Sequence, residues 1–147
     1  MKNIFFILIV LFFSACEDNS LFIKFFDKKH TPIKTGVLSF KTDNYYLLDK
    51  VERSFRKFGY KTVKKSRYHI VLTSHYVISC KNPVVHALGA DFNGYIRLSM
   101  EDRNKEIYRI QKDFKTKVTN TMIDEIVKRM IKDMKMSPSK KDGLKSF

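Results

Sequence analysis

The stretch YHIVLTSHYVISC, residues 68–80, alternates apolar and polar side chains over most of its length. Because successive residues of a strand point to opposite faces of a sheet, this period of two predicts one long strand. One face carries the apolar Ile70, Leu72 and Ile78, and the other face includes His75. We therefore expect a sheet with one strongly apolar face, which needs a covering layer, and one mixed face.

Two further stretches continue the sheet on the C-terminal side. DFNGYIRLSM, residues 91–100, places Ile96 and Leu98 on one face, and EIYRIQKDFK, residues 106–115, is a more polar run. The polar EDRNK between them, residues 101–105, predicts a turn that joins two antiparallel strands. The long strand and this hairpin together predict a mainly antiparallel sheet.

The segment YYLLDKVERSFRKF, residues 45–58, predicts the first helix. Asp43 or Asn44 can cap its N-terminus, since their side-chain oxygens accept a free backbone N–H. Gly59 can end it, because glycine adopts the left-handed conformation without strain. The apolar residues recur at steps of three and four and form one stripe: Leu48, Val51, Phe55 and Phe58.

A second amphipathic helix is predicted after residue 120. Thr121 and Asp124 have the spacing of a capping box, with Asp in place of the usual Glu. The apolar face that follows is wide and comprises Ile123, Ile126, Val127, Met130, Ile131 and Met134.

With the short β-like GVLSF at residues 36–40, the element order is β-α-β-β-β-α. Two helices with one apolar face each, and a mainly antiparallel sheet with one apolar face, fit an α+β two-layer sandwich. We expect residues 36–136 to form this domain and residues 137–147 to form a basic disordered tail. Both helices should cover the sheet face that carries Ile70, Leu72, Ile78, Ile96 and Leu98.

The N-terminus, MKNIFFILIVLFFSAC, has the layout of a secretory signal. Its apolar run over residues 4–13 is shorter than the about 20 residues that a membrane-spanning helix needs. The small residues Ser14 and Ala15 directly before Cys16 resemble a bacterial lipobox, in which the cysteine is acylated after cleavage. Phe13 departs from that motif, which most often has Leu three positions before the cysteine.

We therefore predict a signal peptide over residues 1–15, cleavage after Ala15, and lipid attachment at Cys16. Residues 16–35 should be the acylated N-terminus and a tether, in which the apolar LFIKFF at 21–26 either adds a strand or packs on the domain. An ordinary signal with an incidental cysteine is the alternative. Cys80 is then left without a partner cysteine, so no disulfide scaffold is expected.

The mature chain is strongly basic. Removal of residues 1–15 leaves 28 Lys and Arg against 15 Asp and Glu. Such a surface suits an anionic partner, although it also serves merely to keep a small exported protein soluble. Nucleic acid is not expected for an acylated envelope protein whose aromatic side chains fall mostly on core faces. Anionic lipid or lipopolysaccharide, whose phosphates suit Lys and Arg, fits better.

The sequence contains no catalytic constellation. Phosphate-binding glycine loops and the G-x-S-x-G motif are both missing. His69 and His75 share a strand face, but six residues of strand separate them by about 20 Å, too far for one metal ion. We therefore expect a non-catalytic protein without cofactor or metal.

Two sets of residues are candidates for anion or partner binding. The first alternates outward on the mixed sheet face and comprises His75, Tyr95, Arg97 and Arg109, with Val77 beside them. The second is a basic cluster around the start of the long strand and comprises Lys61, Lys64, Lys65 and Arg67.

The lipobox cysteine, the helix ending in FRKFGY (55–60), the motif SRYHIVLTSHYV (66–77), the hairpin and the terminal helix together resemble the LptE-like small outer-membrane lipoproteins. The same order is similar to auxiliary lipoproteins of ABC-type envelope transporters. Ser66 and His69 depart from the pattern of these families. The resemblance implies a subunit of lipopolysaccharide export and outer-membrane assembly that contacts an anionic lipid and a β-barrel partner, but it identifies no individual binding residue.

We therefore expect a lipid-anchored envelope protein of the outer membrane, on its periplasmic side rather than on the cell surface. Glu17 favours the outer membrane, because it differs from the Asp that resembles an inner-membrane retention signal. An accessory lipoprotein of a lipid-transport ABC system and a surface-exposed, adhesin-type lipoprotein are the alternatives.

Overall fold

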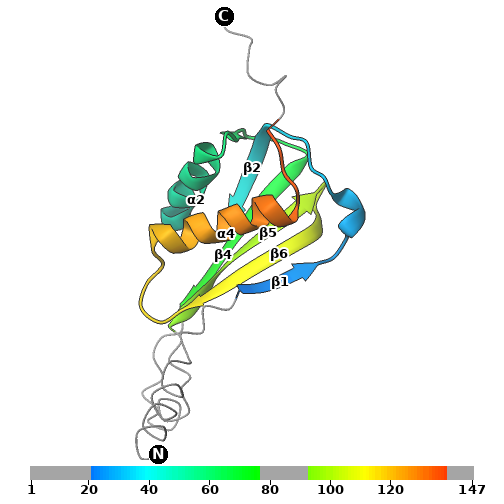
Figure 1. The fold of residues 1–147 in the computed structure, drawn as a ribbon. Coiled ribbons are helices and arrows are strands. Elements are labelled where there is room, and N and C mark those ends of the chain that lie inside the picture. The colour runs from blue at the N-terminus through cyan, green and yellow to red at the C-terminus, as the bar shows by residue number, and fades with distance from the viewer. Residues whose placement is uncertain (1–20, 77–92, 139–147) are drawn as a thin grey trace, which may run out of the picture.

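The computed structural model describes residues 21–76 and 93–138 (Figure 1). Six strands form one sheet in the order β1-β6-β5-β4-β2-β3. The strands are β1 (Leu21–Phe25), β2 (Val37–Thr42), β3 (Lys61–Thr62), β4 (Tyr68–Tyr76), β5 (Gly94–Asp102) and β6 (Lys105–Phe114), with a single 3-10 turn, η1 (Lys28–His30), after β1.

Helices α2 (Tyr45–Lys57) and α4 (Asn120–Asp133) both lie on the same face of this sheet, as Figure 1 shows. The other face carries no helix in the described part of the chain. The fold is therefore the expected α+β sandwich of two layers.

The hairpin between β5 and β6 closes through two residues with positive φ, Arg103 (50°) and Asn104 (69°). A two-residue turn with both residues in the left-handed region matches the twist of antiparallel strands. β4 pairs antiparallel with β5 but parallel with β2, because α2 crosses over between β2 and β4. The sheet is thus mixed, with its antiparallel part where the sequence predicted a hairpin.

The core lies between the sheet and the two helices. Ile70, Leu72, Ile96 and Leu98 are fully buried, which confirms the face that the alternation of the sequence predicted. The expected neighbour Ile78 lies outside the described residues. The helices contribute Leu47, Val51, Phe55, Ile123, Ile126, Val127 and Met130.

Helix α2 is rotated slightly from the predicted stripe. Leu47 is buried, whereas Leu48 is only partly buried and Phe58 is 36% exposed. Asn44 caps the helix, since its side chain accepts a hydrogen bond from the Leu47 N–H. The predicted helix is otherwise confirmed.

The capping box predicted at the second helix is wrong. Thr119, not Thr121, is the N-cap of α4, and its side chain accepts from the Met122 N–H. Asp124 instead accepts hydrogen bonds from Ser54 and Lys57 of α2, each at 2.6 Å. The physical reason is that this carboxylate gains two partners across the helix pair, one of them charged, which is stronger than a local cap.

The domain also begins earlier than the predicted residue 36. β1 pairs antiparallel with β6, Leu21 opposite Lys112, and its partly buried side chains Leu21, Ile23 and Phe25 pack against the core. Ile33 is fully buried, and its backbone N–H and C=O bond to Met134 and Ser137. Of the two alternatives for LFIKFF, the added strand is the one observed.

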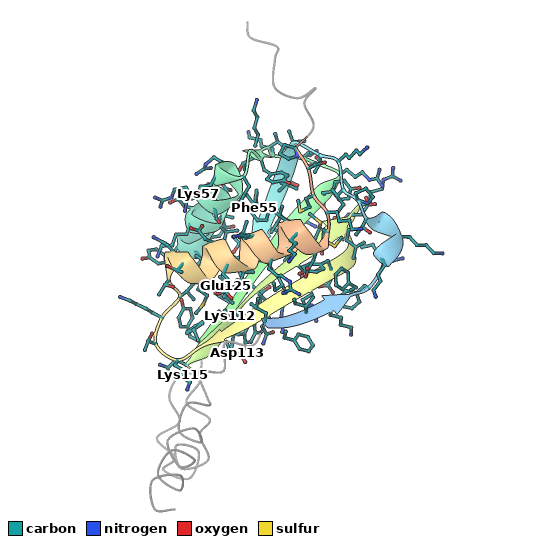
Figure 2. The ribbon with its side chains drawn as sticks, in the orientation of Figure 1. Phe55, Lys57, Lys112, Asp113, Lys115 and Glu125 are labelled. Carbon is teal, nitrogen blue, oxygen red and sulfur yellow. The ribbon has the colours of Figure 1, made fainter. Side chains whose placement is uncertain are left out.

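Lys112 is a cation on the side of the sheet that faces the helices. It points from β6 toward α4 and is only 7% exposed, and its Nζ lies 2.5 Å from a carboxylate oxygen of Glu125 (Figure 2). A buried ammonium needs such a partner, because its removal from water is costly. Lys112 is therefore part of the interlayer packing rather than of a basic surface.

Candidate functional site

The sheet face away from α2 and α4, which we call the open face, carries the first set of predicted binding residues. His75 pairs with Tyr95 across β4 and β5, and Arg97 pairs with Gln111 across β5 and β6. Arg109 lies farther along β6, opposite Ser99 and Lys24. The period of two thus places all four predicted residues on one face, while Val77 lies outside the described residues.

Tyr95 is the centre of a stack on this face. Its ring lies 5.7 Å from the His75 ring, and the Arg97 guanidinium lies over the ring at 4.8 Å. Arg97 also donates from Nε and Nη2 to the Gln111 side-chain oxygen, at 3.1 and 2.7 Å. Both contacts fix the guanidinium in place without neutralising it, because an aromatic face and an amide oxygen carry no full charge.

Arg109, unlike Arg97, forms an ion pair with a carboxylate. Its Nε and Nη2 donate to both carboxylate oxygens of Glu106, at 2.8 and 2.6 Å. Burial raises the pKa of Glu106, but the hydrogen bonds from Arg109 and Ser99, together with the charges of Arg109 and Arg97, outweigh it and lower the pKa overall. Arg109 thus already has a bidentate carboxylate partner, whereas Arg97 makes no ion pair with any residue of the described ranges.

Apolar side chains flank the cations on the β1 side of the open face. Phe22 is 59% exposed and Phe26 is 41% exposed. Lys24 and Arg109 both lie over the Phe26 ring, at 4.7 and 5.2 Å. The open face therefore combines exposed aromatic area with one guanidinium, that of Arg97, which has no carboxylate partner among residues 21–76 and 93–138.

The second predicted set, Lys61, Lys64, Lys65 and Arg67, lies at the other end of β4. Arg67 directly precedes β4, and His75 is near its end, so about 26 Å of strand separates them. Lys64 and Lys65 are exposed in the segment between β3 and β4. The structure therefore does not bring the two predicted sets together.

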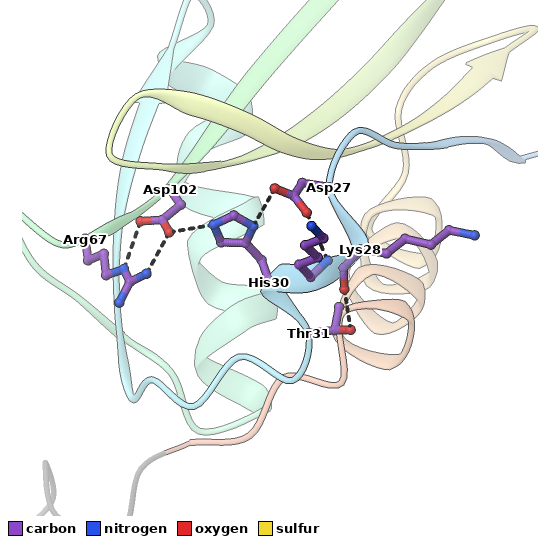
Figure 3. A network of polar contacts seen from close by, with 7 residues as sticks. Asp27, Lys28, His30, Thr31, Arg67 and Asp102 are labelled. Carbon is purple, nitrogen blue, oxygen red and sulfur yellow. Dashed lines mark hydrogen bonds and ion pairs between the residues drawn. The ribbon is translucent and has the colours of Figure 1, made fainter.

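Arg67 already has a carboxylate partner, and its role in anion binding stays a prediction. Its Nε and Nη2 both donate to the buried Asp102, each at 2.8 Å. His30 lies on the far side of that carboxylate, with Nε2 3.1 Å from Asp102 and Nδ1 3.1 Å from Asp27 (Figure 3). We call Asp27, His30, Arg67 and Asp102 the Asp102 clasp.

The Asp102 clasp ties the segment after β1 to the sheet. The hydrogen bond from Arg67 lowers the pKa of Asp102 against the effect of burial, and the charges of Arg67, His30 and Arg103 add to the lowering. The Lys29 backbone N–H likewise lowers the pKa of Asp27. The clasp cannot be found from the sequence, because its members come from three separate segments, residues 27–30, Arg67 and Asp102, and form no local motif.

We predict that the Asp102 clasp stabilises the folded protein and that this stabilisation is lost in acid. Asp102→Asn is expected to lower the free energy of unfolding at pH 7 by about 1–2 kcal/mol, since charge-assisted hydrogen bonds are lost beside a half-exposed Arg67. The folded-state pKa of Asp102 lies below the ordinary 3.8. The stabilisation is therefore present above about pH 4 and is lost as the pH falls through the lowered pKa.

Urea unfolding from pH 7 to pH 3 measures this effect. The difference between the wild type and Asp102→Asn should shrink at the acid end. Asp49→Asn is the matched control, because Asp49 forms exposed helical pairs with Arg53 and Arg56, which contribute little. A difference that is as large at pH 3 as at pH 7 would contradict the assignment.

Neither a metal site nor a membrane-spanning helix is found in the part of the chain that the structure describes. No three of its His, Cys, Asp and Glu side chains are grouped so as to hold a metal ion. No helix among residues 21–76 and 93–138 has both the length and the apolar character needed to cross a bilayer. Cys16 and Ala15 lie outside these ranges, so lipid attachment at Cys16 stays a prediction from sequence.

The candidate site is thus a surface on an α+β sandwich rather than an enclosed pocket. No protein-family model matches the chain, and no curated protein sequence matches it. Among solved structures, the chain is similar to a minor lipoprotein from Acinetobacter baumannii, with a TM-score of 0.34 and 12% sequence identity over 70% of this chain and 92% of that one.

Proposed function

We propose that the protein is a lipid-anchored envelope protein that acts as a non-catalytic binding subunit. The apolar run of residues 4–13, followed by Ser14, Ala15 and Cys16, supports the anchor. Two or three acyl chains on one cysteine hold a protein to a membrane durably, since each buried CH₂ contributes about 0.8 kcal/mol. The domain itself then needs no membrane-spanning element.

The proposed binding role rests mainly on the contacts of the Arg97 side chain. Its guanidinium is held by Tyr95 and Gln111 but has no ion-pair partner in the described ranges, and it lies on a face that none of the described helices covers. A guanidinium can bind a phosphate or carboxylate in bidentate fashion. Phe22 and Phe26 offer apolar contact on the same face.

This combination suits an amphipathic anion. Lipopolysaccharide has phosphates for Arg97 and acyl chains for the aromatic side chains, so we propose it as the ligand of the open face. In this role the protein works on the periplasmic side of the outer membrane, as a subunit of lipopolysaccharide export beside a β-barrel partner. Arg109 is a weaker candidate for direct contact, because Glu106 occupies its guanidinium.

The anchor is tested with Cys16→Ala. The variant is expected to stay an unprocessed precursor and to incorporate no labelled palmitate, because the acylated thiol is missing. Cys80→Ala is the matched control and should be labelled like the wild type. Unchanged labelling of Cys16→Ala would refute the anchor.

A further inference from the structure

The short chain between the proposed lipid attachment and the domain restricts how the domain sits on a membrane. Only four residues separate Cys16 from Leu21, the first residue of β1. Five Cα–Cα steps span at most about 18 Å even when fully extended. The end of the domain that contains Leu21 is therefore held close to the polar headgroups.

The strand register shows which parts of the molecule lie at that end. Leu21 pairs with Lys112, Lys112 with Ile96, and Ile96 with Ser74, so one row crosses four strands. Ser74 accepts a hydrogen bond from the side chain of Asn44, which caps α2. The start of α2, the end of β4, the start of β5 and the end of β6 therefore all lie at the Leu21 end of the sheet.

Exposed aromatic side chains gather at this end. Six large apolar or aromatic side chains are exposed within residues 21–76 and 93–138. Four of them belong to the Leu21 end, namely Phe22 (59%), Tyr45 (78%), Tyr46 (74%) and Tyr76 (48%). The other two, Phe26 and Phe58, lie at the far ends of β1 and α2.

Lysine side chains accompany these tyrosines. The Lys50 ammonium lies 4.6 Å from the centroid of the Tyr46 ring. Lys115, which Figure 2 places beyond the end of β6, and Lys117 are both exposed. Tyr is enriched at membrane–water interfaces, and Lys reaches phosphates there while its stem contacts apolar groups.

We propose that the Leu21 end of the domain, through Tyr45, Tyr46 and Tyr76, rests on the surface of a phospholipid bilayer. This inference depends on the proposed anchor at Cys16. Exposed Asp43 and Asp113 offset part of the lysine charge at this end, so the contact is mainly aromatic. The basic residues Lys64 and Lys65, at the other end of β4, then point away from the protein's own membrane.

The chain contains no tryptophan, so one introduced tryptophan reports from a single place. Tyr46→Trp puts the reporter at the Leu21 end, and Phe58→Trp, at the C-cap of the same helix, is the matched control. Both replace an exposed aromatic residue with another. The acylated proteins are reconstituted in vesicles of phosphatidylethanolamine and phosphatidylglycerol, with or without brominated acyl chains.

The emission of Tyr46→Trp should shift to shorter wavelength on vesicles and lose intensity with brominated lipid, whereas that of Phe58→Trp should do neither. A vesicle-bound, palmitate-labelled protein whose Tyr46→Trp emission is not quenched would overturn the inference and leave the anchor intact. Equal quenching at both positions would also overturn it. A shift of the Tyr46→Trp emission to shorter wavelength without quenching would overturn it too, because protein rather than lipid would then cover this end. Loss of palmitate labelling and of vesicle flotation would instead overturn the anchor, and the inference with it.

Discussion

Replacing Leu72 with alanine is expected to lower the free energy of unfolding by about 2–5 kcal/mol, as large-to-small changes in a packed core do. Leu72 is fully buried on β4, on the sheet face that the helices cover. Its removal leaves a cavity between the two layers that the sheet and helices cannot close without moving together. Urea unfolding of the domain, read by circular dichroism, measures the loss.

Val71 is the control for this experiment. It is the next residue of the same strand, it points to the open face, and it is only partly buried. Val71→Ala should therefore cost clearly less, about 1 kcal/mol or below, because less apolar area is lost. Equal losses at Leu72 and Val71 would mean that the two faces of the sheet are wrongly assigned.

Gly94→Ala is the second change with a large expected effect. Gly94 begins β5 with a φ of 154°, a conformation that favours glycine. An added Cβ would collide with the His75 carbonyl oxygen of the paired strand and would lie 2.8 Å from the Phe114 ring. Overpacking and backbone strain together should lower the free energy of unfolding by about 2–6 kcal/mol.

Gly59→Ala is the control that separates the cost of backbone strain from the cost of overpacking. Gly59 also has a positive φ, 88°, but its added Cβ would meet only Pro138, at 3.3 Å. Its cost should stay near the about 1–2 kcal/mol of the left-handed conformation alone. A Gly94→Ala variant no less stable than Gly59→Ala would show that β4 and β5 do not approach as closely as described.

The strongly periodic parts of the fold could be predicted from the sequence. The alternation in β4 and β5 identified the buried residues Ile70, Leu72, Ile96 and Leu98. The hairpin was predictable because its polar turn separates two such runs. These features are local, since a period of two or of 3.6 records which side of an element meets the core.

The parts that the sequence did not predict depend on contacts between distant segments. β1 is a five-residue edge strand whose place is decided by pairing with β6, more than 80 residues away in the chain. The spacing of Thr121 and Asp124 predicts a local cap, yet the partners of Asp124 lie on α2. Such pairings leave no periodic signal in the sequence.

In the candidate site, too, the local pattern was predictable from the sequence, whereas contacts between distant segments were not. The period of two placed His75, Tyr95, Arg97 and Arg109 on one face, and the strand register bears this out. It did not reveal which cations already have partners. Glu106 is paired with Arg109 and Asp102 with Arg67, and of these three arginines only Arg97 has no carboxylate within ion-pair distance among the described residues.

The most direct test of the binding role compares Arg97→Glu with Lys128→Glu. Lys128 is exposed on α4, in the other layer, so the second variant carries the same change of charge away from the open face. Lys128→Glu should fold with nearly wild-type stability, because an exposed charge contributes little. Arg97 is partly buried and contacts Tyr95 and Gln111, so the stability of Arg97→Glu is measured by urea unfolding and binding is compared under conditions where both variants are folded. Binding of the purified acylated protein to lipopolysaccharide is measured at low and at high salt.

We predict that Arg97→Glu weakens this binding about tenfold or more, since a hydrogen bond to a charged group contributes about 1.5–3 kcal/mol. Lys128→Glu should bind like the wild type, and wild-type binding should fall as salt is raised. If Arg97→Glu binds lipopolysaccharide as tightly as Lys128→Glu, the open face is not the binding site.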